Sequence, residues 1–260
     1  MKKHTYGSGV IGNCAYIAHV ELDTNISWMC LPRFDSDFIF GGMLDREKGG
    51  EFTIRPESKD FKSSQAYLEN TNVLKTTVVS GEDSYAVTDF APRFKNFDRY
   101  YKPLMLVRKI EPIAGSPKIK IICKPRADQG SRGLTASMGS NHISFAGIGQ
   151  ELRLSTNAPL SYVIDEKAFL LTKPVYLVLT FGRPLEAPIE TTSERFLHAT
   201  TNYWHEWVKS TSIYNFHQKL VLRSALILKI HQYEDTGAII AASTTSLPES
   251  PGSTRNWDYR

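Results

Sequence analysis

The residues best suited to chemistry lie near the C-terminus, where two cations, an anion, an amide and two aromatic rings follow one another. They are Arg255, Asn256, Trp257, Asp258, Tyr259 and Arg260, with residues 244–249 (TTSLPE) shortly before them. Burying so many polar groups as packing alone is costly. Sugar sites use this mixture, because rings cover the C–H face of a pyranose while charged groups hydrogen-bond its hydroxyls. The segment predicts either a sugar-binding pocket or a solvated tail.

A second dense motif lies near the N-terminus, at residues 28–36 (WMCLPRFDS). An apolar strand runs into Pro32, and Arg33 and Asp35 then flank Phe34, which we expect to be buried. Two interpretations remain open. The charged residues form an ion pair that ties a hairpin to its neighbour, or they bring a guanidinium and a carboxylate to the rim of a polar-ligand site.

Metal and cofactor motifs are missing from the sequence. It contains no dinucleotide-binding, phosphate-binding, zinc-protease or serine-hydrolase pattern. Of its seven histidines, four fall in the helical part without metal-ligand spacing, whereas catalytic zinc needs three protein ligands. These are His198, His205, His217 and His231. We therefore predict no metal ion and no cofactor.

The composition is that of a folded globular protein. The 260 residues are 41% hydrophobic and 22% charged, which excludes a disordered tail, a collagen-like repeat and a disulfide-rich miniprotein. The net charge of +4 is spread thinly, so we predict no nucleic-acid partner. The apolar runs are too short to span a membrane, and no signal peptide is visible. Cys14, Cys30 and Cys123 are widely separated, which favours reduced, mostly buried thiols and a cytoplasmic location.

Short alternating segments separated by turn signals must position the N-terminal motif. Strands are predicted at 73–79, 85–90, 104–110, 118–123, 152–156 and 175–181. We expect turns at residues 80–83, 114–117 and 130–141, the last being rich in Gly and Ser. Many short strands without helices between them favour an antiparallel β-sandwich.

The pattern changes to a helical period after Pro188. Ser193 is a plausible N-cap for a helix of roughly four turns with a mostly aromatic stripe. A second helix is predicted from about residue 216 to 235, ending before Gly237. Its middle is apolar on nearly every side, so it needs more neighbours than the remaining residues supply. The chain thus reads as the beginning of a helical domain.

Five segments together resemble a known family. They are residues 9–14 (GVIGNC), 27–36 (SWMCLPRFDS), 236–242 (TGAIIAA), 244–249 (TTSLPE) and 255–260 (RNWDYR). In order and spacing they are similar to the prokaryotic glucoamylase-type and trehalase-type enzymes of glycoside hydrolase family fifteen, along the whole chain.

The resemblance implies a mainly β fold with three parts. Residues 1–190 would form an N-terminal β-sandwich and residues 191–210 a linker helix. Residues 211–260 would contain the first helix of an incomplete (α/α)6 catalytic barrel. The missing barrel helices would then cover the apolar second helix.

The resemblance also implies the chemistry. The family hydrolyses terminal α-glucosidic bonds with inversion, using two Glu residues on later barrel loops, so no catalytic residue is expected in this chain. Glu249 does not correspond to either of them. Tyr259 matches a residue packed near the glucose ring, and Trp257, Asp258 and Arg260 would shape that pocket.

Three functions therefore remain open. The chain is an inactive N-terminal portion of a glucoamylase-like α-glucosidase acting on an α-glucan or maltooligosaccharide, or of a trehalase of the same family. Alternatively, it is a non-catalytic glucan-binding sandwich. Arg33 and Asp35 are substrate-binding candidates that should face the barrel mouth and, without the barrel, be exposed or paired with each other. Helix 216–234 should mediate a homodimer or fold back on the sandwich.

Overall fold

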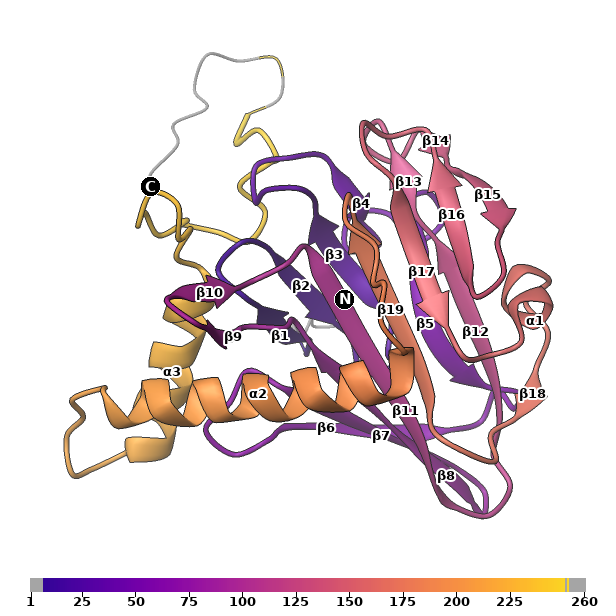
Figure 1. Ribbon diagram of the computed structural model, residues 1–260, viewed down its shortest axis with the longest axis horizontal. Helices are drawn as coiled ribbons and strands as arrows, with labels where there is room; N and C mark the ends of the chain where they lie inside the picture. The colour runs from indigo at the N-terminus through magenta and orange to yellow at the C-terminus, as the bar shows by residue number, and fades with distance from the viewer. Residues whose placement is uncertain (1–6, 251, 253–260) are drawn as a thin grey trace, which may run out of the picture.

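Antiparallel strands in two facing layers are the main regular structure of the described chain (Figure 1). The computed structural model describes residues 7–250 and residue 252. All strand pairs within its sheets are antiparallel. The predicted mainly β sandwich, followed by helices, is therefore confirmed.

One layer is an eight-stranded sheet, in the order β15-β16-β17-β19-β11-β8-β7-β6. Its strands are β6 (Lys62–Tyr67), β7 (Leu74–Ser80), β8 (Asp83–Phe90), β11 (Met105–Ala114), β15 (Thr135–Met138), β16 (His142–Ala146), β17 (Leu152–Thr156) and β19 (Val175–Phe181). Five of the six predicted strands lie in this sheet, and the bounds of β17 and β19 agree with the prediction.

The facing layer combines a four-stranded sheet, β1-β2-β3-β4, with a three-stranded sheet, β18-β12-β5. Their strands are β1 (Gly9–Gly12), β2 (Ile17–Val20), β3 (Ile26–Cys30), β4 (Phe38–Phe40), β5 (Glu51–Pro56), β12 (Lys118–Lys124) and β18 (Phe169–Leu170). Two hairpins complete the strands: β9 (Phe94–Asn96) with β10 (Arg99–Tyr101), and β13 (Arg126–Ala127) with β14 (Arg132–Gly133).

Alternation along the central strands of the large sheet builds two cores. Leu106 of β11 pairs with Leu179 of β19, and both side chains enter the main core between the layers. The next pair, Val107 and Val178, points the opposite way and packs against a helix. Period-two alternation thus gives this sheet an apolar surface on both faces.

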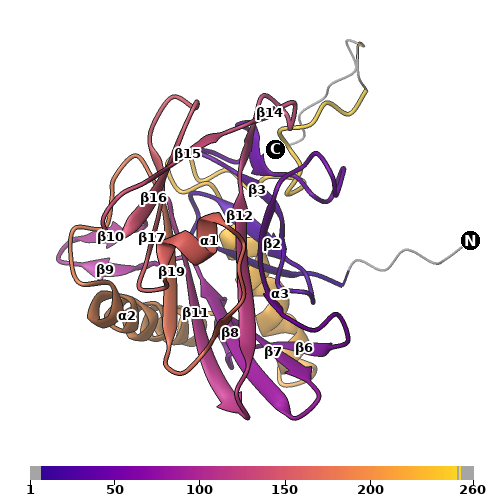
Figure 2. The same cartoon turned by 90° about the vertical axis from the view of Figure 1, so that its right-hand side faces the viewer.

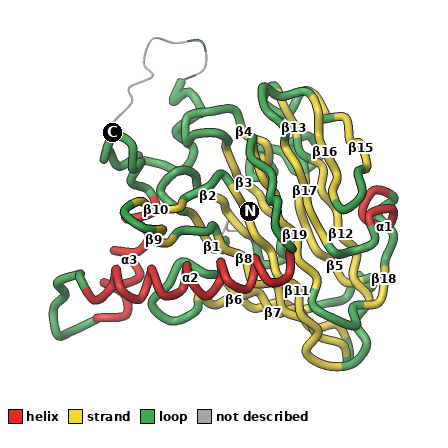
Figure 3. The backbone as a smooth tube through the Cα atoms, in the orientation of Figure 1, coloured by secondary structure: helices red, strands yellow, loops and turns green. Residues whose placement is uncertain are grey.

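Three helices accompany the sheets: α1 (Leu160–Ile164), α2 (Ile189–Lys209) and α3 (Gln218–Ile230) (Figure 3). Figure 2 shows α2 on one side of the strands, while β2, β3 and α3 lie on the other. None of these helices is both long and apolar enough to cross a lipid bilayer.

The structure corrects both helix boundaries. The first helix begins after Pro188, not at Ser193, which is buried inside it. Proline presets φ and has no N–H to leave unsatisfied, so it is well suited to a helix start. The second helix covers only residues 218–230, because His217 adopts a left-handed φ of 50° and the chain turns away after His231.

The Gly- and Ser-rich stretch at 130–141 is also not a simple turn. It contains β14 and the whole of β15, whose residues are all exposed. β15 is only four residues long and lies among Gly and Ser residues that are typical of turns, so the sequence predicts a turn here. The division into domains 1–190, 191–210 and 211–260 stays a prediction.

Candidate functional site

Arg33 and Asp35 lie in the loop between β3 and β4, on the surface. The Arg33 Nε donates a hydrogen bond to Asp35 Oδ1 at 2.9 Å, and the two side chains are 56% and 53% exposed. This hydrogen bond lowers the pKa of Asp35. The expected pairing is present, but within the loop and not to a neighbouring strand. Their role in substrate binding stays a prediction.

Phe34, between them, points inward and is 4% exposed, as the sequence predicted. It joins an apolar cluster with Trp204 of α2 and with Leu226 and Ile230 of α3. Its ring also meets Tyr233 edge to face, with centroids 5.9 Å apart. The loop is thereby fixed to both helices.

The segment after α3 returns to the four-stranded sheet. Trp28 Nε1 donates to the carbonyl oxygen of Ser243 at 2.7 Å, and His19 Nε2 lies 2.8 Å from the Ser243 hydroxyl. Cys30 Sγ and the Ser246 hydroxyl are 3.4 Å apart, while Leu247 packs against the cluster around Trp28. The motifs at 27–36 and 236–249 therefore meet in space. Burial and the neighbouring His231 lower the pKa of His19 to about 4.

The motif at 9–14 contacts the end of α3. Cys14 donates its S–H to the Lys229 carbonyl at 3.2 Å, and its own carbonyl accepts from the Glu234 backbone N–H at 3.1 Å. Gly12 is required by the tight β1–β2 turn, since a Cβ there would lie 2.7 Å from the Tyr16 carbonyl oxygen. We call the surface formed by residues 9–14, 27–37 and 229–247 the motif edge; Figure 1 shows α3 and the yellow segment beside β1–β3.

A buried ion pair holds the motif edge together. Arg93 is 1% exposed, and its Nη2 donates to Glu234 Oε1 at 3.0 Å while its Nη1 donates to the Asn13 carbonyl at 2.9 Å. The guanidinium lies over the rings of Tyr100 and Tyr203, 4.9 and 4.8 Å from their centroids. Cation–π contact adds to the pairing.

Three of the four carboxylates of the motif edge, Asp35, Glu234 and Asp235, are paired with cations. Although burial opposes ionisation of Glu234, Arg93 lowers its pKa, and a hydrogen bond from Lys102 lowers that of Asp235. The hydrogen bond from Arg33 lowers the pKa of Asp35 in the same way. A glycosidase general acid needs the opposite, a raised pKa. These groups therefore suit positioning and not proton donation.

The predicted site residues Trp257, Asp258, Tyr259 and Arg260 lie outside the described residues. Glu249 is exposed. No group of three or more His, Cys, Asp or Glu side chains suited to a metal ion occurs within the described part of the chain.

Three residues of the motif edge and its contacts, Arg93, Glu234 and His19, are not predicted from the sequence. Arg93 follows β8 with no dense motif around it, and its partner is 141 residues away. The one local signal is that Glu234 directly precedes Asp235 and the 236–242 motif at the end of a predicted helix.

Comparison with known proteins gives a family and several relatives. The family model described as "Trehalase-like, N-terminal" matches residues 7–169. A trehalase from Thermoplasma volcanium is 34% identical over 97% of this chain and 41% of its own length, and one from Thermoplasma acidophilum is 32% identical over 93% and 42%. A trehalase from Mycobacterium tuberculosis is 30% identical over 91% of this chain and 38% of its own length.

The chain thus spans about two fifths of the length of these curated relatives. The matches confirm the resemblance drawn from the sequence motifs. Because the family model covers more than half of the residues, from before β1 to the start of β18, this chain belongs to the trehalase-like N-terminal domain family.

Proposed function

We propose that this chain is the N-terminal portion of a trehalase-like glycoside hydrolase whose substrate is α,α-trehalose. The relatives described above are all named trehalase, which favours this alternative over the glucoamylase-like reading that the motifs first indicated. The observation that carries the proposal is the similarity to trehalases over 91–97% of the chain, which includes the motif edge.

The proposed role of the motif edge is to position the catalytic part of the enzyme. Inverting hydrolysis needs a general acid and a general base about 6.5–9.5 Å apart, with room for a water between them. Three of the four carboxylates at this edge instead form ion pairs with Arg33, Arg93 and Lys102. We infer that the acid and base come from residues beyond this chain.

The exposed side of α3 argues against a free-standing glucan-binding sandwich. Leu220 and Leu228 remain 69% and 57% exposed although α3 already packs on the sandwich. A finished module would not expose large aliphatic side chains on a helix next to its binding edge. A catalytic barrel that packs on α3 would cover them.

Glucose release tests the proposal. The purified 260-residue chain should release no glucose from trehalose or maltose, because we expect the catalytic acid and base to come from residues beyond it. The same chain extended through its downstream reading frame should hydrolyse trehalose in preference to maltose. Turnover by the short chain at about 1–10³ per second would contradict the positioning role. A preference for maltose or longer glucans would instead favour a glucoamylase-like function.

A further inference from the structure

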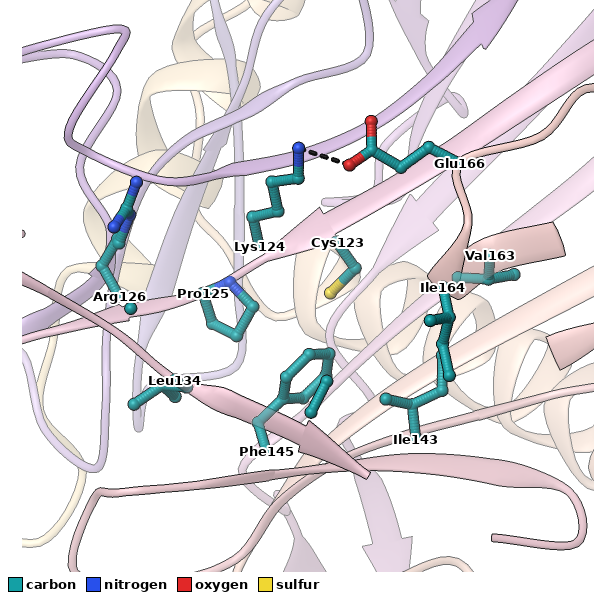
Figure 4. Close-up of a pocket in the computed structure, with 12 residues that line it drawn as sticks. Cys123, Lys124, Pro125, Arg126, Leu134, Ile143, Phe145, Val163, Ile164 and Glu166 are labelled. Carbon is teal, nitrogen blue, oxygen red and sulfur yellow. Dashed lines mark ion pairs between the residues drawn. The ribbon is translucent and has the colours of Figure 1, made fainter. Parts of the chain in front are cut away.

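A pocket of about 320 Å³ opens at the end of the sandwich opposite α3. It lies between β12, β14–β16 and α1. Figure 4 shows apolar side chains on one side of it, including Phe145 and Ile143, and charged side chains on the other. The thiol of Cys123 faces the space between them. This amphipathic lining and volume are typical of a site for a small ligand.

Three charged residues line the pocket, and two of them, Lys124 and Glu166, form an ion pair with each other. Glu166 forms ion pairs with Lys124 and with Lys120, the latter at 3.5 Å. Although burial opposes its ionisation, Lys124 lowers the pKa of Glu166. The carboxylate is therefore charged and paired at neutral pH.

Arg126 is the third charged residue at the pocket, and it differs from the other two in having no charged partner among the described residues. Its Nε is buried without a hydrogen-bond partner, and its guanidinium forms no ion pair within the described residues. Two glycines lie against this side chain: a Cβ at Gly133 would be 3.4 Å from Nη1, and one at Gly50 would be 3.0 Å from Cγ. A guanidinium with unused donors presents the planar fork that carboxylates bind.

We propose that this pocket binds a compact amphipathic carboxylate, with its anionic group on Arg126 and its apolar body against Phe145 and Ile143. A volume near 320 Å³ suits one ring or a branched aliphatic chain. The lining of this pocket includes no residue of the motif edge, although Arg126 also lines a neighbouring pocket with Pro32 and Asp37. The inference does not depend on the proposed hydrolase activity.

Fluorine NMR titration with 4-fluorobenzoate tests the site. Binding to the 260-residue chain should weaken by about 10-fold or more in Arg126→Gln, because the charge-assisted hydrogen bonds are lost. Arg132→Gln is the matched control: Arg132 is exposed, paired with Asp128 and not part of the pocket lining, so it should leave binding unchanged. The neutral analogue 4-fluorobenzamide should bind the unaltered chain no better than it binds Arg126→Gln.

Alkylation of Cys123 gives an independent readout. Saturating 4-fluorobenzoate should slow the reaction of Cys123 with iodoacetamide, followed by peptide mass spectrometry, without affecting Cys14 or Cys30. If Arg126→Gln does not fold, Ala136→Trp should fill the pocket and abolish both binding and protection, whereas Ser137→Trp outside the lining should not. Equal affinity for acid and amide, binding unchanged in Arg126→Gln or Ala136→Trp, or unprotected Cys123 would overturn the proposal.

Discussion

Arg93 joins three segments that are far apart in the sequence. Its guanidinium reaches the Asn13 carbonyl, the Glu234 carboxylate and the two tyrosine rings at positions 100 and 203. Since the arginine is 1% exposed, water cannot replace a lost partner. The course of the chain beyond α3 therefore depends on this residue.

We expect Glu234→Gln to lower the free energy of unfolding by about 3 kcal/mol, because it leaves the Arg93 charge buried and unpaired. Asp35→Asn is the matched control: it breaks the exposed pair with Arg33 and should cost less than about 1 kcal/mol. Urea unfolding measures both. Equal effects of the two changes would contradict the role assigned to Arg93.

His19 should make stability depend on pH. Its pKa in the folded chain is about 4, below the ordinary 6.5, because of burial and His231. The unfolded chain therefore binds the proton first, so the free energy of unfolding should fall as pH drops through 6.5 and level off below about 4. The loss is at most about 3 kcal/mol.

Urea unfolding between pH 7.5 and pH 4 checks this expectation. His19→Gln should remove this part of the pH dependence, while His198→Gln on the exposed face of α2 should leave it intact. A profile that His19→Gln does not change would show that the ring is not buried neutral against Ser243.

Helix α2 connects the large sheet to α3 through two different positions. Phe196 packs with Val107 and Val178 on the outer face of the sheet, whereas Trp204 packs with Leu226 and Ile230 of α3. The same helix thus covers the sandwich and holds the motif edge.

Trp204→Ala should lower the free energy of unfolding by about 3–5 kcal/mol, since it empties a fully buried site. Trp207→Ala, at a half-buried position of the same helix, should cost clearly less. Thermal or urea unfolding distinguishes the two. A smaller loss from Trp204→Ala than from Trp207→Ala would contradict the packing described here.

Several elements with apolar patterns could be predicted, whereas short strands such as β4 and polar ones such as β15 could not. The bounds of β17 and β19 follow directly from β-branched and aliphatic runs. The exposed β15 has no such pattern. Ser193 is the more usual type of N-cap residue, so the sequence favours it over Pro188, where the helix in fact begins. At the site, motif density located Arg33 and Trp28, whereas the pairing of Arg93 with Glu234 depends on tertiary packing alone.

At the scale of the molecule, helix α3 keeps an apolar side uncovered by the other described residues. Leu226 and Ile230 of α3 are buried on the sandwich, which agrees with the expected folding back, but Leu220 and Leu228 are exposed. The homodimer predicted through helix 216–234 would use this remaining side.

We expect the isolated chain to self-associate, because exposed aliphatic side chains on one helix favour contact with a second copy. Combined Leu220→Glu and Leu228→Glu should give a monomer by light scattering, with little change in urea unfolding. Lys219→Glu and Lys229→Glu together serve as a control that alters charge but keeps the leucines. A wild-type chain that stays monomeric at high concentration would contradict the predicted dimer.

The central position of β19 bears on where this protein can be shortened. The family match ends at residue 169, but β19 lies at 175–181 and pairs with both β11 and β17 in the middle of the large sheet. A polypeptide ending at 169 would expose two unpaired strand edges and is expected to aggregate. The smallest autonomous folding unit therefore extends at least through Phe181, beyond the boundary that sequence comparison draws.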